Sequence, residues 1–212
     1  MGTAFLIARV ALFERLLGNG NHLGIKITYK VQQKAEGLAQ AFLIGKDFIG
    51  SSNVVLILGD NLFHGETLEA HFAKSKHKNI GATVFAYPVK NPERYGVANF
   101  DNNGHIISIE EKPKSPKSKY AITGIYFFDN SVIKKAESVK PSSRGELEIT
   151  DLNKKYLDEG NLKTITLGRG FAWLDTGTHD SLLDASHFVS TLEKRQGLKI
   201  ACPEEIAFRN GW

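Results

Sequence analysis

The chain has very few of the residues that mark secreted or membrane-bound proteins. Among its 212 residues only Cys202 is a cysteine, so no intramolecular disulfide can form and we expect a reducing, cytoplasmic location. No apolar run approaches the length needed to cross a bilayer, which predicts no membrane association. Repeats, linkers and low-complexity tracts are also absent from the sequence. We therefore predict a single domain over residues 1–212.

The apolar N-terminus lacks the marks of a targeting signal. It has no basic region ahead of the apolar residues, Arg9 interrupts the run, and no small-residue cleavage site follows. Leu6 stands where N-myristoylation of Gly2 would require Ser or Thr. Because no capping residue or turn precedes this stretch, it reads as though the chain entered in the middle of a secondary-structure element.

Charge of one sign is not concentrated in any tract. The 27 Lys and Arg residues slightly outnumber the 23 Asp and Glu residues, and the basic ones are spread along the chain. This distribution predicts no nucleic-acid partner and is compatible with a small anionic ligand. A content of 42% hydrophobic and 24% charged residues is typical of an ordinary globular domain with a sizeable core.

One apolar stretch organises the chain. Val54 to Leu58 are five consecutive apolar residues, the pattern of a strand buried on both faces of a parallel sheet, and Gly59-Asp60 ends the run. Ligands of open α/β sheets bind at the carboxyl ends of the strands, so the Asp60 carboxylate is a candidate for a metal or substrate site. The alternative is that Asp60 and Asn61 only form a turn.

The remaining pattern predicts an α/β fold. Strands alternate with helices up to Pro92, which is typical of parallel crossover units, and Asp101-Asn102-Asn103-Gly104 then marks a hairpin between antiparallel strands. We therefore predict a mixed, mostly parallel sheet with helices on both faces. Strands are expected at 25–31, 54–58, 82–89, 95–100, 106–111, 121–128, 162–167 and 171–175, and helices at 12–17, 36–45, 68–76, 131–138, 146–158 and 178–196.

Polar clusters stand at the ends of these elements in a specific order. They are Gly59-Asp60-Asn61, Glu93-Arg94-Tyr95-Gly96-Val97, Glu110-Glu111-Lys112-Pro113, residues 144–151 (RGELEITD) and residues 173–178 (WLDTGT). Together with the phrases at 124–129 (GIYFFD), 168–170 (GRG) and 195–199 (RQGLK), this series resembles the glucose-1-phosphate thymidylyltransferases, which make dTDP-glucose from dTTP and glucose 1-phosphate. The similarity runs from about Leu16 to Phe208.

The resemblance implies a fold, a reaction and a set of site residues. The implied fold is the Rossmann-like nucleotide-diphospho-sugar transferase fold, and the implied enzyme is a cytoplasmic, Mg²⁺-dependent nucleotidyltransferase of dTDP-rhamnose and polysaccharide biosynthesis. Mg²⁺ prefers oxygen ligands from carboxylates and phosphates. The residues that match the family pattern are Asp60 and Asp175 for the metal, Tyr95, Gly96, Glu111, Lys112, Tyr126 and Arg144 for the sugar phosphate, and Gln32 and Gly37 for the base; Asp60, Lys112, Arg144 and Asp175 form the implied catalytic set.

Simpler readings of these residues stay open. Asp175 can cap the turn that leads into the next helix, and Glu111 and Lys112 can belong to a solvated strand end. Arg144 can pair with Glu146 or Glu148. Each side chain therefore has a structural explanation beside the functional one that the resemblance implies.

The sequence departs from the family at both ends. The glycine-rich loop of the form Gly-Gly-x-Gly-Thr-Arg-Leu, whose N–H groups and arginine hold the triphosphate, occurs nowhere in the 212 residues. Family members also continue beyond the position of Phe208 into a helical segment. We therefore expect a domain incomplete at both ends, with weak or no turnover and an exposed sheet edge. The expected assembly is a homo-oligomer, and the alternative function is a non-catalytic binding or regulatory subunit that associates with an intact homologue.

Overall fold

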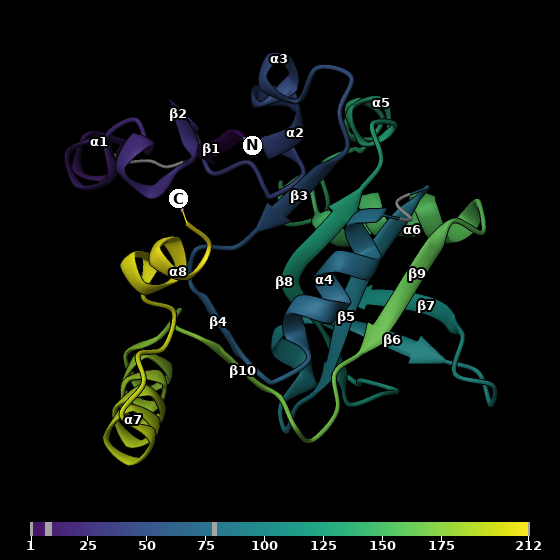
Figure 1. Cartoon of the computed structure of the whole chain (residues 1–212). Coiled ribbons are helices and arrows are strands. Elements are labelled where there is room, and N and C mark those ends of the chain that lie inside the picture. Colours follow the sequence, from purple (N-terminus) through teal and green to yellow (C-terminus); the bar gives the residue numbers. More distant parts are fainter. Residues whose placement is uncertain (1, 7–9, 78–79, 212) are drawn as a thin grey trace.

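The structure is a computed structural model that describes residues 2–6, 10–77 and 80–211, and its centre is a six-stranded sheet with helices on both faces (Figure 1). The strand order is β7-β6-β8-β5-β9, with β3 paired to β8 beside this path. The strands are β3 (Val54–Ile57), β5 (Ala82–Pro88), β6 (Gly96–Phe100), β7 (Ile106–Glu111), β8 (Tyr120–Phe128) and β9 (Leu162–Thr166).

Strand β8 holds the sheet together because it pairs with three neighbours. One edge of β8 pairs with β5 along most of its length. The other edge pairs with β6 near its beginning, where Ala121 faces Val97, and with β3 near its end, where Ile125 faces Ile57. Strands β6 and β3 therefore diverge along the same edge of β8, and the residues of β8 between them border the candidate site.

The predicted fold class is confirmed, with one qualification about strand pairing. Strands β3, β5, β6 and β9 run in one direction and β7 and β8 in the other, so most of the six strands share a direction. The pairings themselves are antiparallel except that between β5 and β9, because β8 lies among strands that run opposite to it. The hairpin expected after Pro92 is present as β6 and β7.

The prediction for β3 was wrong in two respects. Its partner is the antiparallel strand β8, and it is not buried on both faces, since Val55 is 40% and Ile57 60% exposed. An unbroken apolar run shows that a strand tolerates burial, but the neighbouring elements decide whether both faces are covered. The exposed edge expected from the sequence is therefore accompanied by exposed apolar side chains.

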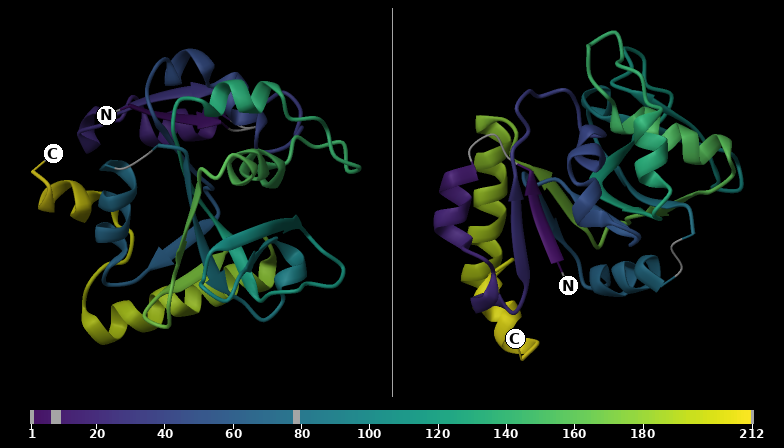
Figure 2. Two further views of the ribbon diagram at one scale, coloured as in Figure 1. Left: turned by 90° about the vertical axis from the view of Figure 1, so that its right-hand side faces the viewer. Right: turned by 90° about the horizontal axis from the view of Figure 1, so that it is seen from above.

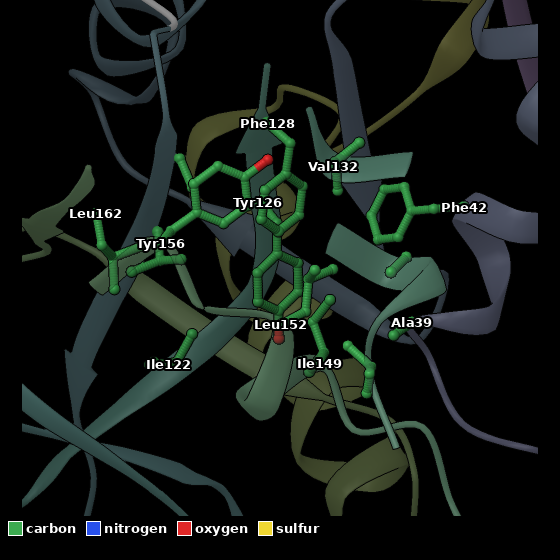
Figure 3. Packing of buried hydrophobic residues seen from close by; sticks show 14 of the residues in the cluster. Ala39, Phe42, Ile122, Tyr126, Phe128, Val132, Ile149, Leu152, Tyr156 and Leu162 are labelled. Atoms are coloured by element: carbon green, nitrogen blue, oxygen red, sulfur yellow. The ribbon is translucent and has the colours of Figure 1, made fainter. Parts of the chain in front are cut away.

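Helices on one face of the sheet enclose the larger core. Helices α2 (Gln40–Ile44), α5 (Val132–Glu137) and α6 (Ile149–Asp158) pack there. The Phe128 ring pairs with those of Phe42 and Tyr156, and Figure 3 shows all three in this core. The Phe42 and Phe128 centroids are 5.2 Å apart in an edge-to-face arrangement, a favoured geometry for aromatic pairs. On the other face, α4 (Leu68–His77) contributes Phe72 to a smaller cluster with Phe85.

Two small sheets lie beside the main one. Strand β1 (Gly2–Leu6) pairs in parallel with β2 (Lys26–Lys30), and β4 (Asn61–His64) pairs antiparallel with β10 (Ala172–Asp175). Helix α7 lies at the opposite end of the molecule from α3 and α5 (Figure 2). The remaining elements are α1 (Val10–Leu17), η1 (Asn21–Leu23), α3 (Lys46–Ile49), η2 (Pro92–Arg94), α7 (His179–Gln196) and α8 (Pro203–Arg209).

Most element boundaries agree with the sequence pattern, and the differences have local causes. Helix α7 begins after Thr178, whose hydroxyl accepts a hydrogen bond from the Ser181 amide as part of a capping box. Helix α2 begins at Gln40 rather than near residue 36, because Gly37 has a φ of 101° that no helix allows. Helix α6 likewise begins at Ile149 rather than near residue 146. The sequence pattern missed β1, β4, α3 and α8, and β4 is essential to the candidate site.

Candidate active site

The pairing of β4 with β10 brings Asp60 and Asp175 together. Asp60 immediately precedes β4, Asp175 ends β10, and the Thr176 amide donates a hydrogen bond of 2.8 Å to the Asp60 carbonyl. A Cβ atom built on Gly177 would lie 3.6 Å from Asp60 Oδ2 and 3.9 Å from Asp175 Oδ1. The two carboxylates therefore border the same small space.

The route by which they meet differs from the expected one. Residues 171–175 were predicted as a strand of the main sheet, but β10, which Asp175 ends, belongs to the two-stranded sheet with β4. The chain crosses from β3 to β4 within three residues, and Asp60, the last of them, is joined to the residue after β10 by the Thr176 amide. A short strand without an alternating pattern gives little sequence signal, so this pairing is visible only in the structure.

Asp175 is held in place as an ionised acceptor. The Tyr95 hydroxyl donates a hydrogen bond of 2.5 Å to Asp175 Oδ2, and Arg94 Nη2 lies 3.9 Å from the same oxygen. Burial opposes ionisation, but hydrogen bonds from Tyr95, Ser181 and the Gly177 amide and the Arg94 charge outweigh it, so the pKa of Asp175 is below its usual value. Burial and the bond to Asp175 raise the pKa of Tyr95 to about 12, which keeps this phenol a donor at neutral pH.

A cavity of about 360 Å³ opens where β6 and β3 diverge along β8. Its floor includes Ile122 and Gly124 of β8, and its sides come from β6, β7, α6 and the β4/β10 pair. Seven of the residues predicted from the sequence line it: Asp60, Tyr95, Gly96, Glu111, Lys112, Tyr126 and Asp175.

One wall of the cavity is tightly interlocked. Thr150 Oγ1 donates a hydrogen bond of 2.5 Å to Glu111 Oε2, and a Cβ on Gly96 would come within 2.9 Å of Thr150 Oγ1. Only glycine therefore lets β6 approach α6 this closely. Glu111 lines the cavity, with one carboxylate oxygen held by Thr150.

Arg144 reaches this wall through Glu111. Its Nη1 lies 3.5 Å from Glu111 Oε1 and 3.6 Å from Glu148 Oε1, and its Nη2 lies 2.9 Å from Glu146 Oε1. The structural reading of this arginine is therefore met, because it pairs with Glu146 and Glu148 and in addition with Glu111, and its role toward the sugar phosphate stays a prediction.

Lys112 follows Glu111 in an unusual backbone conformation. Its φ is 41°, in the left-handed region that residues with a side chain rarely adopt, and its amide donates to the Tyr95 carbonyl at 3.0 Å. Such conformations cost free energy and are often found at functional sites. The result is an exposed cation at the mouth of the cavity, beside the strand end that carries Tyr95 and Gly96.

Gln32 and Gly37 lie together in a neighbouring segment. Gln32 Nε2 donates to the Gly37 carbonyl at 3.3 Å and to Gln40 Oε1 at 2.6 Å. A Cβ on Gly37 would approach the Leu147 carbonyl to 2.4 Å, so glycine is required where this segment crosses Leu147. Leu38 continues from here into the lining of the cavity, which makes the two predicted regions adjacent.

Sequence reasoning missed several residues of the cavity. Trp173 lines it, with a ring centroid 5.1 Å from that of Tyr95, and Asn61 contacts both Trp173 and Asp60. Thr150 was quoted only as part of residues 144–151, yet it is 2% exposed and bonded to Glu111. Trp173, Asn61 and Thr150 all belong to the polar clusters quoted above, and that neighbourhood was the available signal.

The cavity is acidic at its base. Burial raises the pKa of the Tyr126 phenol, and the charges of Glu111 and Asp60 raise it further. Asp175 adds a third carboxylate, whereas the cations Arg94 and Lys112 also line the cavity. A phosphate ligand would need a further cation next to the two aspartates, because like charges repel strongly at close range.

Comparison with known proteins identifies the family. Residues 8–191 match the nucleotidyl transferase family. The chain belongs to this family. It is 57% identical over 202 residues to a glucose-1-phosphate thymidylyltransferase of Neisseria meningitidis, covering 95% of this chain and 70% of that protein. It is 56% identical over 200 residues to the enzyme of the same name from Mycolicibacterium smegmatis, covering 94% of this chain and 69% of that protein.

Solved structures agree with this assignment. A Bacillus anthracis protein described as a glucose-1-phosphate thymidylyltransferase, in complex with a sucrose, is 43% identical with a TM-score of 0.78, over 87% of this chain and 74% of that one. A UDP-glucose pyrophosphorylase complexed with UDP-glucose has a TM-score of 0.74 at 21% identity, over 90% of this chain and 81% of that one, and supports the fold alone.

These findings confirm the resemblance and the fold class predicted from the sequence. The nucleotidyltransferase class of the chain is confirmed as well. The chain spans about 70% of the length of the Neisseria relative. In the part of the chain that the structure describes, none of the helices is long and apolar enough to cross a membrane.

Proposed function

We propose that the chain binds glucose 1-phosphate and Mg²⁺ as part of a glucose-1-phosphate thymidylyltransferase of dTDP-sugar biosynthesis, and that by itself it turns over dTTP slowly. The observation that carries this proposal is the cavity, which gathers seven predicted residues from β6, β7, β8 and the β4/β10 pair. Its volume of about 360 Å³ is within the range of small-ligand sites.

The hexose would lie against the interlocked wall. The Glu111 carboxylate accepts hydrogen bonds from sugar hydroxyls, and the absence of a side chain at Gly96 lets the strand backbone come close to the ring. Lys112 at the mouth neutralises the phosphate as a point charge. The 2.5 Å bond from Thr150 fixes one oxygen of Glu111, so the carboxylate is oriented before the ligand arrives.

The two aspartates fit a magnesium ion. Asp60 Oδ2 and Asp175 Oδ1 border one space beside Gly177, and a pair of carboxylates completed by phosphate oxygens suits this hard cation. When bound, Mg²⁺ would neutralise phosphate charge and orient the reacting groups. The chain's own contribution is to keep Asp175 ionised through Tyr95 and Arg94.

The proposed reaction is an in-line attack by a phosphate oxygen of glucose 1-phosphate on the α-phosphorus of dTTP. The new P–O bond forms as the bond to the leaving pyrophosphate breaks, so the reaction consumes one dTTP for each dTDP-glucose. Loss of one preorganised charge stabiliser costs about 100- to 1000-fold in rate. Because the glycine-rich loop and its arginine are missing from the 212 residues, we expect these residues to bind glucose 1-phosphate but to turn over dTTP slowly.

A second candidate function is a non-catalytic subunit that associates with an intact homologue. The observation that favours it is strand β3, where Val55 and Ile57 are 40% and 60% exposed and where β8 is the one strand paired with it among the described residues. Exposed strand edges with apolar side chains are sites of strand addition. Co-purification of the chain with a full-length homologue, in a complex abolished by Ile57→Lys, would support this role.

The test of the main proposal is calorimetric titration of the chain with glucose 1-phosphate and Mg²⁺. Glu111→Gln removes a charged acceptor, so we expect its dissociation constant to rise about ten- to a hundredfold. Glu69→Gln, an exposed acid on α4, is the matched control and should bind as the unmodified chain does. A folded chain with no measurable affinity for glucose 1-phosphate would overturn the proposal.

Turnover is measured separately as pyrophosphate release from dTTP and glucose 1-phosphate with Mg²⁺. Asp60→Asn removes a predicted metal ligand and should abolish whatever release the chain shows. Release at the same rate in the Asp60→Asn variant would exclude Asp60 from the metal site.

A further inference from the structure

Asn61 occupies a central position between the two aspartates. It directly follows Asp60 in the chain, and in the β4/β10 ladder it is the residue opposite Asp175. Its carboxamide makes three hydrogen bonds: Oδ1 accepts from the Gly124 amide at 3.1 Å and from Trp173 Nε1 at 2.6 Å, and Nδ2 donates to Asp60 Oδ1 at 2.7 Å. Its side chain therefore links Gly124 in the floor of the cavity and Trp173 in its lining to the predicted metal ligand Asp60.

The two bonds to Oδ1 fix the orientation of the amide. A backbone amide and an indole N–H are donors only, so the atom between them must be the carbonyl oxygen of Asn61. A flipped amide would place its NH₂ group against both donors and leave Asp60 Oδ1 facing an oxygen. The amide hydrogens therefore point to Asp60, whatever else occupies the cavity.

Strand β8 makes room for this arrangement at Gly124. A Cβ on Gly124 would lie 2.5 Å from Asn61 Oδ1, closer than any real side chain allows. Glycine here has a specific purpose, because it lets the β8 backbone bond directly to the Asn61 side chain.

The hydrogen bond from Asn61 orients the carboxylate of Asp60. Oδ1 is held by Asn61, and Oδ2 is the oxygen that lies 3.6 Å from the Cβ position of Gly177, on the side of Asp175. We propose that Asn61 is a positioning residue, which turns Asp60 Oδ2 toward Asp175 so that the two carboxylates bind one divalent cation together. This inference rests on the metal site of the proposed function. Such outer hydrogen bonds typically contribute about 10- to 100-fold to metal affinity.

The experiment measures Mn²⁺ binding to the chain by electron paramagnetic resonance, with the metal alone as the probe. We expect Asn61→Ala to weaken Mn²⁺ binding by about 10- to 100-fold while the protein stays folded by circular dichroism. The matched control is Asn130→Ala, which removes two hydrogen bonds to the Gly50 and Ser52 carbonyls far from the cavity and should leave Mn²⁺ affinity unchanged.

A double-mutant cycle separates positioning from a structural role. If Asn61 acts through Asp60, then Asn61→Ala has no further effect on Mn²⁺ affinity in the Asp60→Asn background. Equal losses in both backgrounds would overturn the inference. A folded Asn61→Ala protein that binds Mn²⁺ like the unmodified chain would overturn it as well. Failure of the unmodified chain to bind Mn²⁺ would overturn the proposed metal site, and the positioning role with it.

Asn61→Asp keeps the test decisive if the alanine variant does not fold. The aspartate has the same shape and still accepts from Gly124 and Trp173, but it places an oxygen against Asp60 Oδ1 in place of a donor. We expect Mn²⁺ affinity to fall because Asp60 turns away from the repulsion. A rise in affinity, caused by the added negative charge alone, would show that the direction of Asp60 does not matter.

Discussion

The two sides of the cavity differ in how closely their side chains are packed and how exposed they are. On the side of β6, β7 and α6, Glu111, Thr150 and Gly96 are interlocked, and Thr150 is only 2% exposed. On the opposite side, Leu38 at the cavity rim is 40% exposed. Next to the cavity but outside its lining, Val55 and Ile57 of β3 are 40% and 60% exposed. The side proposed to bind the sugar is therefore closely packed, whereas the side toward the predicted base segment is more exposed. We expect the two sides to respond differently to the same kind of change.

The largest expected effect is a loss of turnover without a comparable loss of glucose 1-phosphate binding. The proposal is that the residues for the sugar phosphate are present, whereas the loop for the triphosphate is missing from the 212 residues. The chain should then bind glucose 1-phosphate within about tenfold of the affinity of the Neisseria relative. It should release pyrophosphate at least about 100-fold more slowly than that relative. Calorimetry and a coupled pyrophosphate assay on both proteins measure the two quantities. Equal turnover numbers would show that the two sides are equally competent.

A matched pair of isoleucines tests burial across one strand pairing. Ile125 of β8 and Ile57 of β3 face each other in the ladder, and they are 4% and 60% exposed. We expect Ile125→Ala to lower the free energy of unfolding by about 2–5 kcal/mol, as for other buried aliphatic residues, and Ile57→Ala by less than about 1 kcal/mol. Urea denaturation measures both. Similar losses would mean that the β3 face is covered in solution.

Gly96 offers a test of the interlocked wall. A methyl group there would lie 2.9 Å from Thr150 Oγ1, so Gly96→Ala should lower the free energy of unfolding by about 1–3 kcal/mol and weaken glucose 1-phosphate binding. Gly168→Ala is the control, because a Cβ there meets no described atom within 4 Å. An unaffected affinity in Gly96→Ala would show that this wall yields easily.

The smallest expected effect concerns the pH dependence of the Tyr95–Asp175 contact. The pKa of Asp175 is lowered in the folded protein, so its ionised form contributes stability above the unfolded pKa of about 3.9, and that contribution is lost as the pH falls through the folded value. Tyr95→Phe should therefore cost about 1 kcal/mol at pH 7 and progressively less below pH 4. Denaturation curves at several pH values measure this difference. A cost that stays constant down to pH 3 would contradict the assigned contact.

Local patterns in the sequence predicted most elements but not their surroundings. The apolar run of β3 resembles that of β8, yet Ala121 to Phe128 are all buried while Val55 and Ile57 are exposed. Apolar residues indicate where burial is favourable, but the number of covering elements depends on chain segments far away. β4 was missed for a related reason, since its four residues carry no alternation that distinguishes a strand from a loop.

The candidate site divides in the same way. Asp60 stands out in the sequence because a carboxylate directly after an apolar strand suggests ligand chemistry, whereas Glu111 and Asp175 were identified through the resemblance to the family. Their partners Asn61 and Thr150 do not, because a single amide or hydroxyl acquires meaning only from the groups it faces. Asn61 and Thr150 were not singled out because the type of a polar residue does not indicate its role until its neighbours in the fold are known.

The α/β class and most strands and helices follow from the sequence alone, because periodicity and residue type act over short distances along the chain. Most of the site residues were identified through the resemblance of the sequence to a family. The meeting of Asp60 with Asp175, the packing of Gly96 against Thr150 and the exposure of β3 were decided only by the tertiary structure. Each depends on pairing between segments far apart in the chain, such as β4 with β10 and β8 with β3. Such pairings are set by the whole packed core, since a strand can bond to any compatible edge and the fold as a whole selects which one it meets.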